Sequence, residues 1–432
     1  MTDRVVLVIG AGVAGLAAAA DLTRAGRRVI VLEARDRIGG RVFSLSLPGV
    51  RRPVELGAEF IHGHSNALWP LVQQAGLAVE PVTERHEGLR EGRPAPLPDV
   101  RRTLGRLLGP NPATRPDRIL GEVIDERRAA GDDPRALAAT IGYVEGFHAA
   151  DVRRIGIRAL AENEKAEDED GEDAFLLPGG YDAVSRWLRD QCTASLLDLR
   201  LSTPVLSLRW KPGEVTAVVR TARGDTEEVA GSQAVITLPL GILKGGVDEG
   251  LIDPLPARWH EALDSLEMGA SHRIVLRFDR AWWNQGSDAP ISFVHGPGSA
   301  FPVWWASRPG NDHRLTGWTG GPRALALAGR PREDVIAAAT DSLEAIFGPR
   351  AGEEMDRLLG AYHHDWITDP YARGAYSFGG VHAREARAVL SDPVEDTLVL
   401  SGEALAMQGR NATVHGALIS GRRAAELIPA RG

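Results

Sequence analysis

The 432-residue sequence predicts an α/β protein in which a doubly wound parallel sheet is interrupted by an inserted α+β domain. Residues 4–33 read as strand, glycine-rich turn, helix and strand, which is a βαβ unit. Near the end of the chain, residues 398–400 predict a further strand and residues 413–427 a last helix. The residues between these two ends differ from them in composition. Because the chain is too long for one compact core, we expect two domains, the first assembled from separated segments.

The opening βαβ unit is the clearest element. Arg4 to Ile9 is a β-branched run that predicts a buried parallel strand. Gly10 to Gly15 makes a turn, and Leu16 to Arg24 is Ala-rich with helical spacing. Val29 to Glu33 then predicts the second strand.

The central part of the chain is expected to mix helices and strands. Helices are predicted at 113–146 (two), 181–191 and 335–347, and strands at 200–209, 214–221, 234–238 and 273–278, the last half-buried. The stretch 91–116, rich in Pro, Arg and Gly, predicts a loop or a boundary. Tryptophans 282, 283, 304, 305 and 318 are candidate pocket walls, and the two Trp-Trp pairs fit strands with one ring inward and one outward.

Residues 162–173 carry eight acids against one lysine. A solvated loop is the favoured interpretation, because charge blocks usually face water. The alternative is an acidic lip that attracts polyamines.

Charge and composition exclude several classes of protein. The net charge of −8 gives no nucleic-acid footprint and mildly favours a cationic ligand. The single Cys192 excludes an intramolecular disulfide and fits a reducing compartment. No stretch is long and apolar enough to cross a bilayer, and the glycines within Val5 to Ala20 argue against a signal peptide. We therefore expect a cytoplasmic protein without membrane or nucleic-acid partners, of undetermined oligomeric state.

The turn Gly10-Ala11-Gly12-Val13-Ala14-Gly15 has the spacing G-x-G-x-x-G between a strand and a helix. The first glycine permits the tight turn, the second lets backbone N–H groups approach a pyrophosphate, and the third lets the helix pack on the strand. Glu33 ends the second strand and is expected to bind ribose hydroxyls. Together these features predict a Rossmann-type dinucleotide site.

The segment after Glu33 distinguishes between dinucleotides. It reads E-A-R-D-R-I-G-G-R over residues 33–41, and its two glycines and Arg41 suit a phosphate. This run, after a dinucleotide fingerprint, resembles the flavin amine oxidases: monoamine oxidases, polyamine oxidases and the lysine-specific histone demethylase. Further segments resemble the same family, in the same order: VELGAEFIHG at 54–63, ITLPLGILK at 236–244, WITDPYARGAYS at 366–377, LSGE at 400–403 and ATVHGALISG at 412–421.

The resemblance implies bound FAD, held by a discontinuous Rossmann-type domain. The positions that the resemblance and the dinucleotide motif assign to the cofactor are Gly10, Gly12, Ala14, Gly15, Glu33, Ala34, Arg35, Gly39, Gly40, Arg41, Gly57, Ala58, Glu59, Val205, Gly402, Glu403, Thr413 and Val414. The last helix should begin near Thr413, with its positive end toward the reduced flavin ring. Covalent attachment is not expected, because Ala375 stands where monoamine oxidases carry the flavin-linked cysteine.

The resemblance also implies catalytic positions. Tyr376 matches the aromatic residue beside the flavin, and Trp366 opens the same segment. Thr413 replaces the second tyrosine of monoamine oxidases, so the usual pair of rings is incomplete. His62 matches the active-site histidine of mammalian polyamine oxidases, with a satisfied structural histidine as the equal alternative.

Arg273 is the main departure from the family pattern. The family usually carries a lysine there, bridged by water to the flavin, whereas arginine stays charged and cannot act as a base. Arg273 is expected to hold that water or to supply positive charge for the reaction with O2. The alternative is a plain ion pair with a surface acid.

We expect an FAD-dependent oxidase that takes hydride from the carbon next to the nitrogen of a polyamine or another small-molecule amine, with O2 as acceptor and H2O2 as product. An L-amino-acid oxidase, with Arg273 binding the substrate carboxylate, another flavin dehydrogenase, and a non-catalytic flavin-binding scaffold remain alternatives. The cofactor domain is expected at 1–80, 176–249 and 385–432, and the substrate domain at 81–175 and 250–384. No metal site is expected, because the acids and histidines lack metal-ligand spacing.

Overall fold

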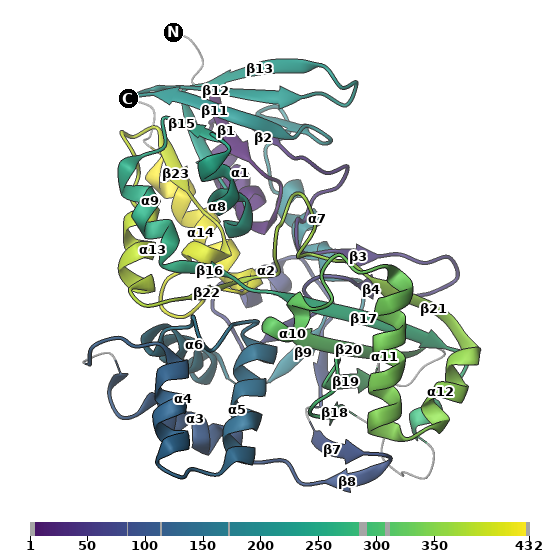
Figure 1. Ribbon diagram of the computed structural model, residues 1–432. Coiled ribbons are helices and arrows are strands. Elements are labelled where there is room, and N and C mark those ends of the chain that lie inside the picture. The colour runs from purple at the N-terminus through teal and green to yellow at the C-terminus, as the bar shows by residue number, and fades with distance from the viewer. Residues whose placement is uncertain are drawn as a thin grey trace.

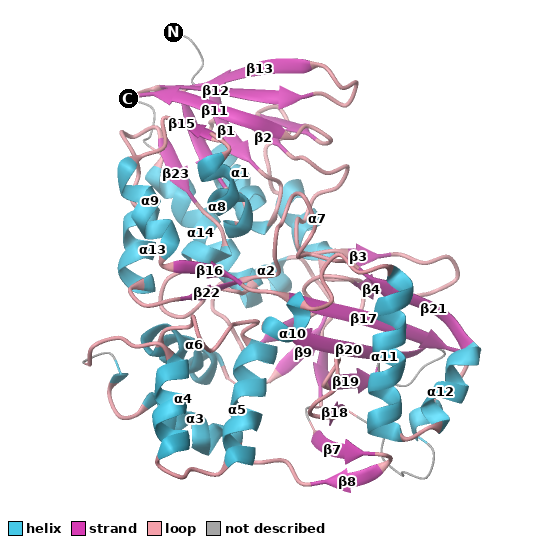
Figure 2. Cartoon of the chain, in the orientation of Figure 1, coloured by secondary structure: helices cyan, strands magenta, loops and turns pink. Residues whose placement is uncertain are grey.

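The computed structural model describes residues 5–83, 85–112, 115–171, 173–284, 292–306 and 312–428. Figure 1 shows a parallel sheet in the upper part of the molecule, near both chain ends. A group of helices lies at the lower left and a large sheet at the lower right, as the colours of Figure 2 make plain.

The parallel sheet has the strand order β10 (Leu197–Arg200), β2 (Arg28–Leu32), β1 (Val5–Ile9), β14 (Gln233–Ile236) and β23 (Leu398–Leu400). Helices cover both of its faces. Val6 and Val8 pack into one core with helices α1 (Val13–Arg24), α7 (Asp182–Asp190) and α14 (Val414–Leu427). Leu7 and Ile9 pack into another core, with α8 (Leu240–Asp248), α9 (Ala257–Asp264) and α13 (Ala383–Ser391). Burial on both faces explains why β1 is apolar throughout.

The described residues also form smaller sheets. One has the order β13 (Thr226–Gly231), β12 (Glu214–Arg220), β11 (Val205–Lys211) and β15 (Ile252–Asp253). The others comprise β3 (Ser44–Leu45) with β4 (Val54–Glu55), β16 (Leu266–Met268) with β22 (Ser377–Gly379), and β5 (Phe60–His62), β9 (Ala174–Leu176) and β6 (Glu80–Val82), with helix α2 (Leu68–Gln74) following β5.

A seven-stranded sheet forms the other large layer. Its order is β21 (Leu358–His363), β17 (Ser271–Phe278), β20 (His313–Gly320), β19 (Val303–Ala306), β18 (Phe293–His295), β7 (His86–Arg90) and β8 (Arg93–Ala95). One face packs on α11 (Arg332–Phe347), which is followed by α12 (Arg350–Glu354) and the 3-10 turn Met355–Arg357 and preceded by α10 (Pro322–Leu325). The prediction that 273–278 is half-buried is wrong, because residues on both faces of β17 are buried.

Four helices form the remaining group: α3 (Val100–Leu108), α4 (Leu120–Ala129), α5 (Pro134–Phe147) and α6 (Ile157–Asp170). They share an apolar core that includes Leu104, Ile124, Val144 and Leu160. The side chains of Asp99 and Asp133 accept backbone N–H groups at the starts of α3 and α5, as N-caps do.

Three local predictions are wrong. The acidic stretch 162–173 is helical as far as Asp170, because Ala159, Leu160, Asn163 and Ala166 recur at helical spacing and are buried together. The stretch 91–116 contains β8 and α3 rather than a loop alone. Trp282 and Trp283 lie in a 3-10 turn with both rings buried, whereas Trp304 and Trp305 do lie on a strand. No helix in the described part of the chain is both long and apolar enough to span a membrane.

Candidate active site

One cavity of about 1450 Å³ runs from the Gly10 turn to the seven-stranded sheet and the α5–α6 helices. All but one of the sequence-predicted site residues line it; the exception is Gly15. The two regions that the sequence analysis assigned to cofactor and substrate therefore open into the same space.

The glycine turn has room for a dinucleotide and close packing behind it. A Cβ at Gly12 would meet nothing within 4 Å, whereas a Cβ at Gly15 would lie 2.0 Å from the carbonyl oxygen of Gly10. Gly10 itself has a φ of +104°, which side-chain-bearing residues rarely adopt. Gly15 thus sets the contact between helix and turn, and Gly12 leaves open the space above the start of α1.

Glu33 is held in place at the carboxyl end of β2. Its carboxylate accepts the backbone N–H of Ala11 at 2.7 Å and that of Arg35 at 2.9 Å. Burial raises the pKa of Glu33 above its ordinary value, against the opposing effect of these two donors. The side chain lines the cavity beside Ala34 and Val205, where a ribose bound over the glycine turn would lie.

Arg35 and Trp366 are joined through residues that the sequence analysis did not identify. Both guanidinium NH2 groups of Arg35 donate to Asp369, at 2.6 and 3.0 Å. His364 contacts the same carboxylate at 2.7 Å and lies against the Trp366 ring, 4.2 Å between centroids. Trp366 donates its indole N–H to the carbonyl oxygen of Leu56 at 2.7 Å. These bonds connect segments more than 300 residues apart and fix the Trp366 ring at the cavity wall.

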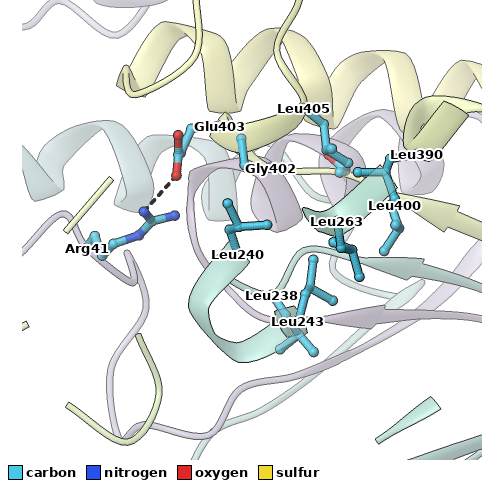
Figure 3. Close-up of a pocket in the computed structure, with 12 residues that line it drawn as sticks. Arg41, Leu238, Leu240, Leu243, Leu263, Leu390, Leu400, Gly402, Glu403 and Leu405 are labelled. Atoms are coloured by element: carbon cyan, nitrogen blue, oxygen red, sulfur yellow. Dashed lines mark hydrogen bonds and ion pairs between the residues drawn. The ribbon is translucent and has the colours of Figure 1, made fainter. Parts of the chain in front are cut away.

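Arg41 and Glu403 form the central ion pair of the predicted cofactor site, at 2.8 Å (Figure 3). Glu403 also accepts the Ser377 hydroxyl at 2.7 Å and the Ala412 N–H at 2.8 Å. Although burial opposes ionisation, Arg41 and these donors hold the pKa of Glu403 below its ordinary value. On the other side of the pair, leucines of α8, α9, α13 and β23 close a small apolar cavity. The Glu403 carboxylate thus links three chain segments, those of Arg41, Ser377 and Ala412.

The last helix begins where it was expected. Thr413 is its N-cap: the hydroxyl accepts the Gly416 N–H at 2.9 Å and donates to the Arg410 carbonyl at 2.7 Å. Its role is therefore to shape the helix start that borders the cavity. Gly402, also at this border, would meet nothing within 4 Å if it carried a Cβ.

These observations fit FAD. An open backbone turn, a fixed carboxylate at the ribose position and a helix N-terminus line one continuous cavity, and each suits a different part of that molecule. Gly39, Gly40, Gly57 and Ala58 add backbone along the same wall.

Arg273 lies on β17 with its guanidinium almost fully buried. It donates to the carbonyl oxygens of Glu55 and Gly57, at 3.2 and 3.0 Å. Its other terminal nitrogen is 3.1 Å from Glu59. The rings of Trp305 and Trp318 lie 5.4 and 5.6 Å from the guanidinium carbon. The acid that pairs with Arg273 is thus not a surface residue, because Glu59 is 18% exposed.

Aromatic rings and carboxylates also line the cavity at α5 and α6. Tyr376 donates its hydroxyl to the Phe147 carbonyl at 2.7 Å. The Phe147 ring stacks on Tyr143, 5.5 Å between centroids and 8° from parallel. The edge of the His62 ring meets Phe147 at 5.7 Å. These rings form an aromatic wall at the junction of α5 with the cavity.

The acids of α6 stand beside this wall. Glu164 accepts the Tyr143 hydroxyl at 3.0 Å and lies 2.9 Å from His148. Burial raises the pKa of Glu167 to about 7, with the His148 charge opposing the shift. Both carboxylates line the cavity, together with Asp168 and Asp170. The sequence analysis held an acidic lip over 162–173 only as its alternative and did not identify Tyr143 or Phe147. The helical spacing of the buried residues from Ala159 to Ala166 was a usable signal for the α6 helix.

Comparison with known proteins adds family evidence. The model of the family described as flavin containing amine oxidoreductase matches residues 13–429. The human lysine-specific histone demethylase 2 is 28% identical over 99% of this chain and 54% of its own length. Probable polyamine oxidase 4 of Arabidopsis thaliana is 28% identical over 98% of this chain and 86% of its own length. The chain therefore spans about half the length of the demethylases it matches.

Solved structures share the fold. A putrescine oxidase bound to putrescine superimposes with a TM-score of 0.80 at 22% identity, covering 99% of both chains. Cyclohexylamine oxidase from Brevibacterium oxydans gives the same TM-score and identity, over 99% of this chain and 98% of the other. The matched family model spans nearly the whole chain and includes both walls of the cavity. The chain therefore belongs to the flavin containing amine oxidoreductase family.

Proposed function

We propose that this chain oxidises a small cationic amine, of the polyamine type or another primary or secondary amine. When bound, FAD would accept hydride from the carbon next to the amine nitrogen and pass the electrons to O2, giving H2O2. The product imine then hydrolyses to an aldehyde or a ketone.

The observation that carries this proposal is the wall formed by α5 and α6. Tyr143, Phe147 and Tyr376 line the cavity with their aromatic side chains, and Glu164 and Glu167 line it beside them. Aromatic faces attract cations, and a carboxylate in a partly dry cavity attracts an ammonium more strongly than one in water does. An arriving ammonium is therefore attracted both by the aromatic rings and by the carboxylates. This happens next to Tyr376, the ring predicted to lie beside the flavin.

The residues of this chain then have separable roles. Glu167, with a pKa near 7, is suited to hold an ammonium or to take its proton. Tyr376 orients the substrate through a ring fixed by its bond to the Phe147 carbonyl. His62 lies at the edge of the Phe147 ring and is suited to bind a second nitrogen.

The state of Arg273 favours an amine over an amino acid. Binding a substrate carboxylate would use the two terminal nitrogens of the guanidinium as a fork. In this chain one of them donates to two backbone carbonyls and the other faces Glu59. We therefore assign Arg273 a fixed positive charge beside the aromatic wall and no carboxylate-binding role.

We also propose that residues 1–80, 176–249 and 385–432 bind FAD and that 81–175 and 250–384 bind the amine. All five strands of the parallel sheet come from the first set of segments, and the seven-stranded sheet comes from the second.

An anaerobic reduction screen tests the function. The purified protein is expected to be yellow, to bleach with diamines, polyamines or monoamines, and to recover its colour in air with release of H2O2. Bleaching by L-amino acids but not by amines would replace the proposal with an amino-acid oxidase. A yellow protein that no amine bleaches would contradict catalysis altogether.

A further inference from the structure

A single row of residues crosses the seven-stranded sheet beneath the cavity. Strand register pairs Arg273 with Trp318, Trp318 with Val303, and Val303 with His295. The row continues from His295 to Gly88 and on to Ala95. All six residues line the cavity, so the sheet forms one continuous floor that leads away from Arg273.

The strand order gives the distance along this floor between Arg273 and His295. His295 is three strands from Arg273, and neighbouring strands are about 4.8 Å apart, so the two backbones lie roughly 14 Å apart. An extended aliphatic chain advances roughly 1.25 Å per bond, so about eleven bonds span that distance. The far end of a long linear amine oxidised beside Arg273 would therefore reach His295.

His295 is held in one orientation. Its Nε2 lies 2.8 Å from Nδ1 of His86, on the neighbouring strand. The His86 ring stacks on Phe293, 5.0 Å between centroids. The pairing uses one ring nitrogen of His295 and leaves Nδ1 as a donor or an acceptor, depending on the tautomer.

This end of the floor differs chemically from the α6 wall. The cavity-lining residues on β19, β18 and β7 are Val303, Trp305, Phe293, His295, His86 and Gly88, none of which is a carboxylate. Burial and the neighbouring His86 lower the pKa of His295 to about 4, so its ring is neutral at neutral pH. An ammonium would lack a counter-charge here, whereas an uncharged polar group finds a hydrogen-bonding partner among apolar surfaces.

The geometry points to His295 as a specificity residue that binds the uncharged polar end, such as an amide or a hydroxyl, of a long linear amine. The inference rests on the proposed function and deepens it. The reacting nitrogen lies beside Arg273 and the aromatic wall, and the distal group lies three strands away along the floor.

The test uses free and mono-N-acetylated hexane-, octane-, decane- and dodecanediamine, with butylamine as a short reference. In the wild-type holoenzyme, kcat/KM is expected to rise with length in the acetylated series and to exceed that of the free diamine at decane or dodecane length. His295→Phe keeps a ring and removes the hydrogen bond. It should lower kcat/KM for the long acetylated substrates by roughly three- to tenfold, the usual worth of one hydrogen bond. Butylamine oxidation should stay within about twofold, since butylamine makes no distal contact.

Controls separate this inference from a folding defect and from the proposed function. His260→Phe alters an exposed histidine on α9 and should leave every substrate unchanged. His86→Phe keeps His295 but removes its ring partner, and it should weaken the preference in the same direction. Equal losses for butylamine and the acetylated series, or no change in either variant, would overturn the assignment of His295. A wild-type protein that oxidises none of the amines, butylamine included, would instead overturn the proposed function.

Discussion

The two ends of the cavity are built differently. At the cofactor end, Glu33 is fixed by two backbone N–H groups, and Glu403 by a backbone N–H group and by the side chains of Ser377 and Arg41. At the amine end, Oε2 of Glu59 lies 3.1 Å from the Arg273 guanidinium, and Nε of Arg273 is buried without a hydrogen-bond partner in the described structure. Buried polar groups normally have partners. The two carboxylates of the cofactor end therefore have partners within the protein, whereas the amine end retains a donor that substrate or water can satisfy.

The largest loss of stability and of bound FAD is expected from disturbing the close contact between Gly15 and the Gly10 backbone at the cofactor end. Gly15→Ala places a Cβ 2.0 Å from the Gly10 carbonyl oxygen. Moving that backbone should cost about 3 kcal/mol of folding stability or more and abolish FAD retention. Flavin absorbance of the purified protein and its thermal midpoint measure both effects.

Gly105→Ala is the matched control. Gly105 lies on an exposed face of α3, and its added Cβ would meet nothing within 4 Å. The alanine should leave flavin content unchanged and stabilise the helix by up to about 1 kcal/mol. If Gly15→Ala behaved like this control, the close packing of the turn would not matter for cofactor binding.

The next largest loss of stability is expected from breaking the Arg41–Glu403 ion pair. Glu403→Gln leaves the Arg41 charge without its counter-ion, and loss of one partner of a buried pair costs about 3–5 kcal/mol. Because its folded pKa is lowered, Glu403 stabilises the wild type above the ordinary carboxylate pKa, and this contribution is lost as the pH falls through the lowered value.

Thermal melts across acidic pH should show this loss in the wild type and not in Glu403→Gln. Asp125→Asn breaks exposed ion pairs with Arg128 and Arg153 and should leave the melting temperature nearly unchanged. Parallel acid profiles for the wild type and Glu403→Gln would contradict the role of Glu403.

At the amine end, Arg273→Met should change kinetics as well as stability, because it also leaves Glu59 without its counter-ion. It removes the positive charge and two bonds to backbone carbonyls, and we expect about a tenfold loss in anaerobic flavin reduction or in reoxidation by O2. Stopped-flow absorbance separates the two half-reactions. Arg273→Lys keeps the charge and should recover part of the affected rate; if neither rate moves in Arg273→Met, the charge has no catalytic role.

The smallest and most specific effect is a pH dependence. Glu167 becomes charged as the pH rises through about 7, because burial raises its pKa. The KM for a diamine should therefore fall as the pH rises, by up to about tenfold between pH 6 and pH 8, while the substrate remains cationic. Glu167→Gln should flatten this profile. The control Glu169→Gln, at an exposed residue of α6 that pairs with Lys165, should keep the profile of the wild type. A wild-type profile that persists in Glu167→Gln would assign the titration to another group.

Local sequence predicted much of the cofactor end and little of the amine end. The glycine turn, Glu33 and the helix start at Thr413 depend on backbone geometry set by a few consecutive residues, so motif spacing was sufficient to locate them. Asp369 was missed as a partner of Arg35, because 334 residues separate them. The acids of α6 were misplaced in a loop, because charge alone does not distinguish a helix face from a solvated turn.

The sequence by itself determined the βαβ unit, the order of the family segments and the residue types available for chemistry. Only the tertiary structure decided that Arg273, Trp318, Val303 and His295 form one row, since strand register between distant segments sets that alignment. It also decided which acids face the cavity, because a helix directs its side chains according to the face it buries. The physical reason is the sequence separation of the interacting residues. Turns and caps are specified by neighbouring residues, whereas a cavity wall is specified by packing between elements far apart in the chain.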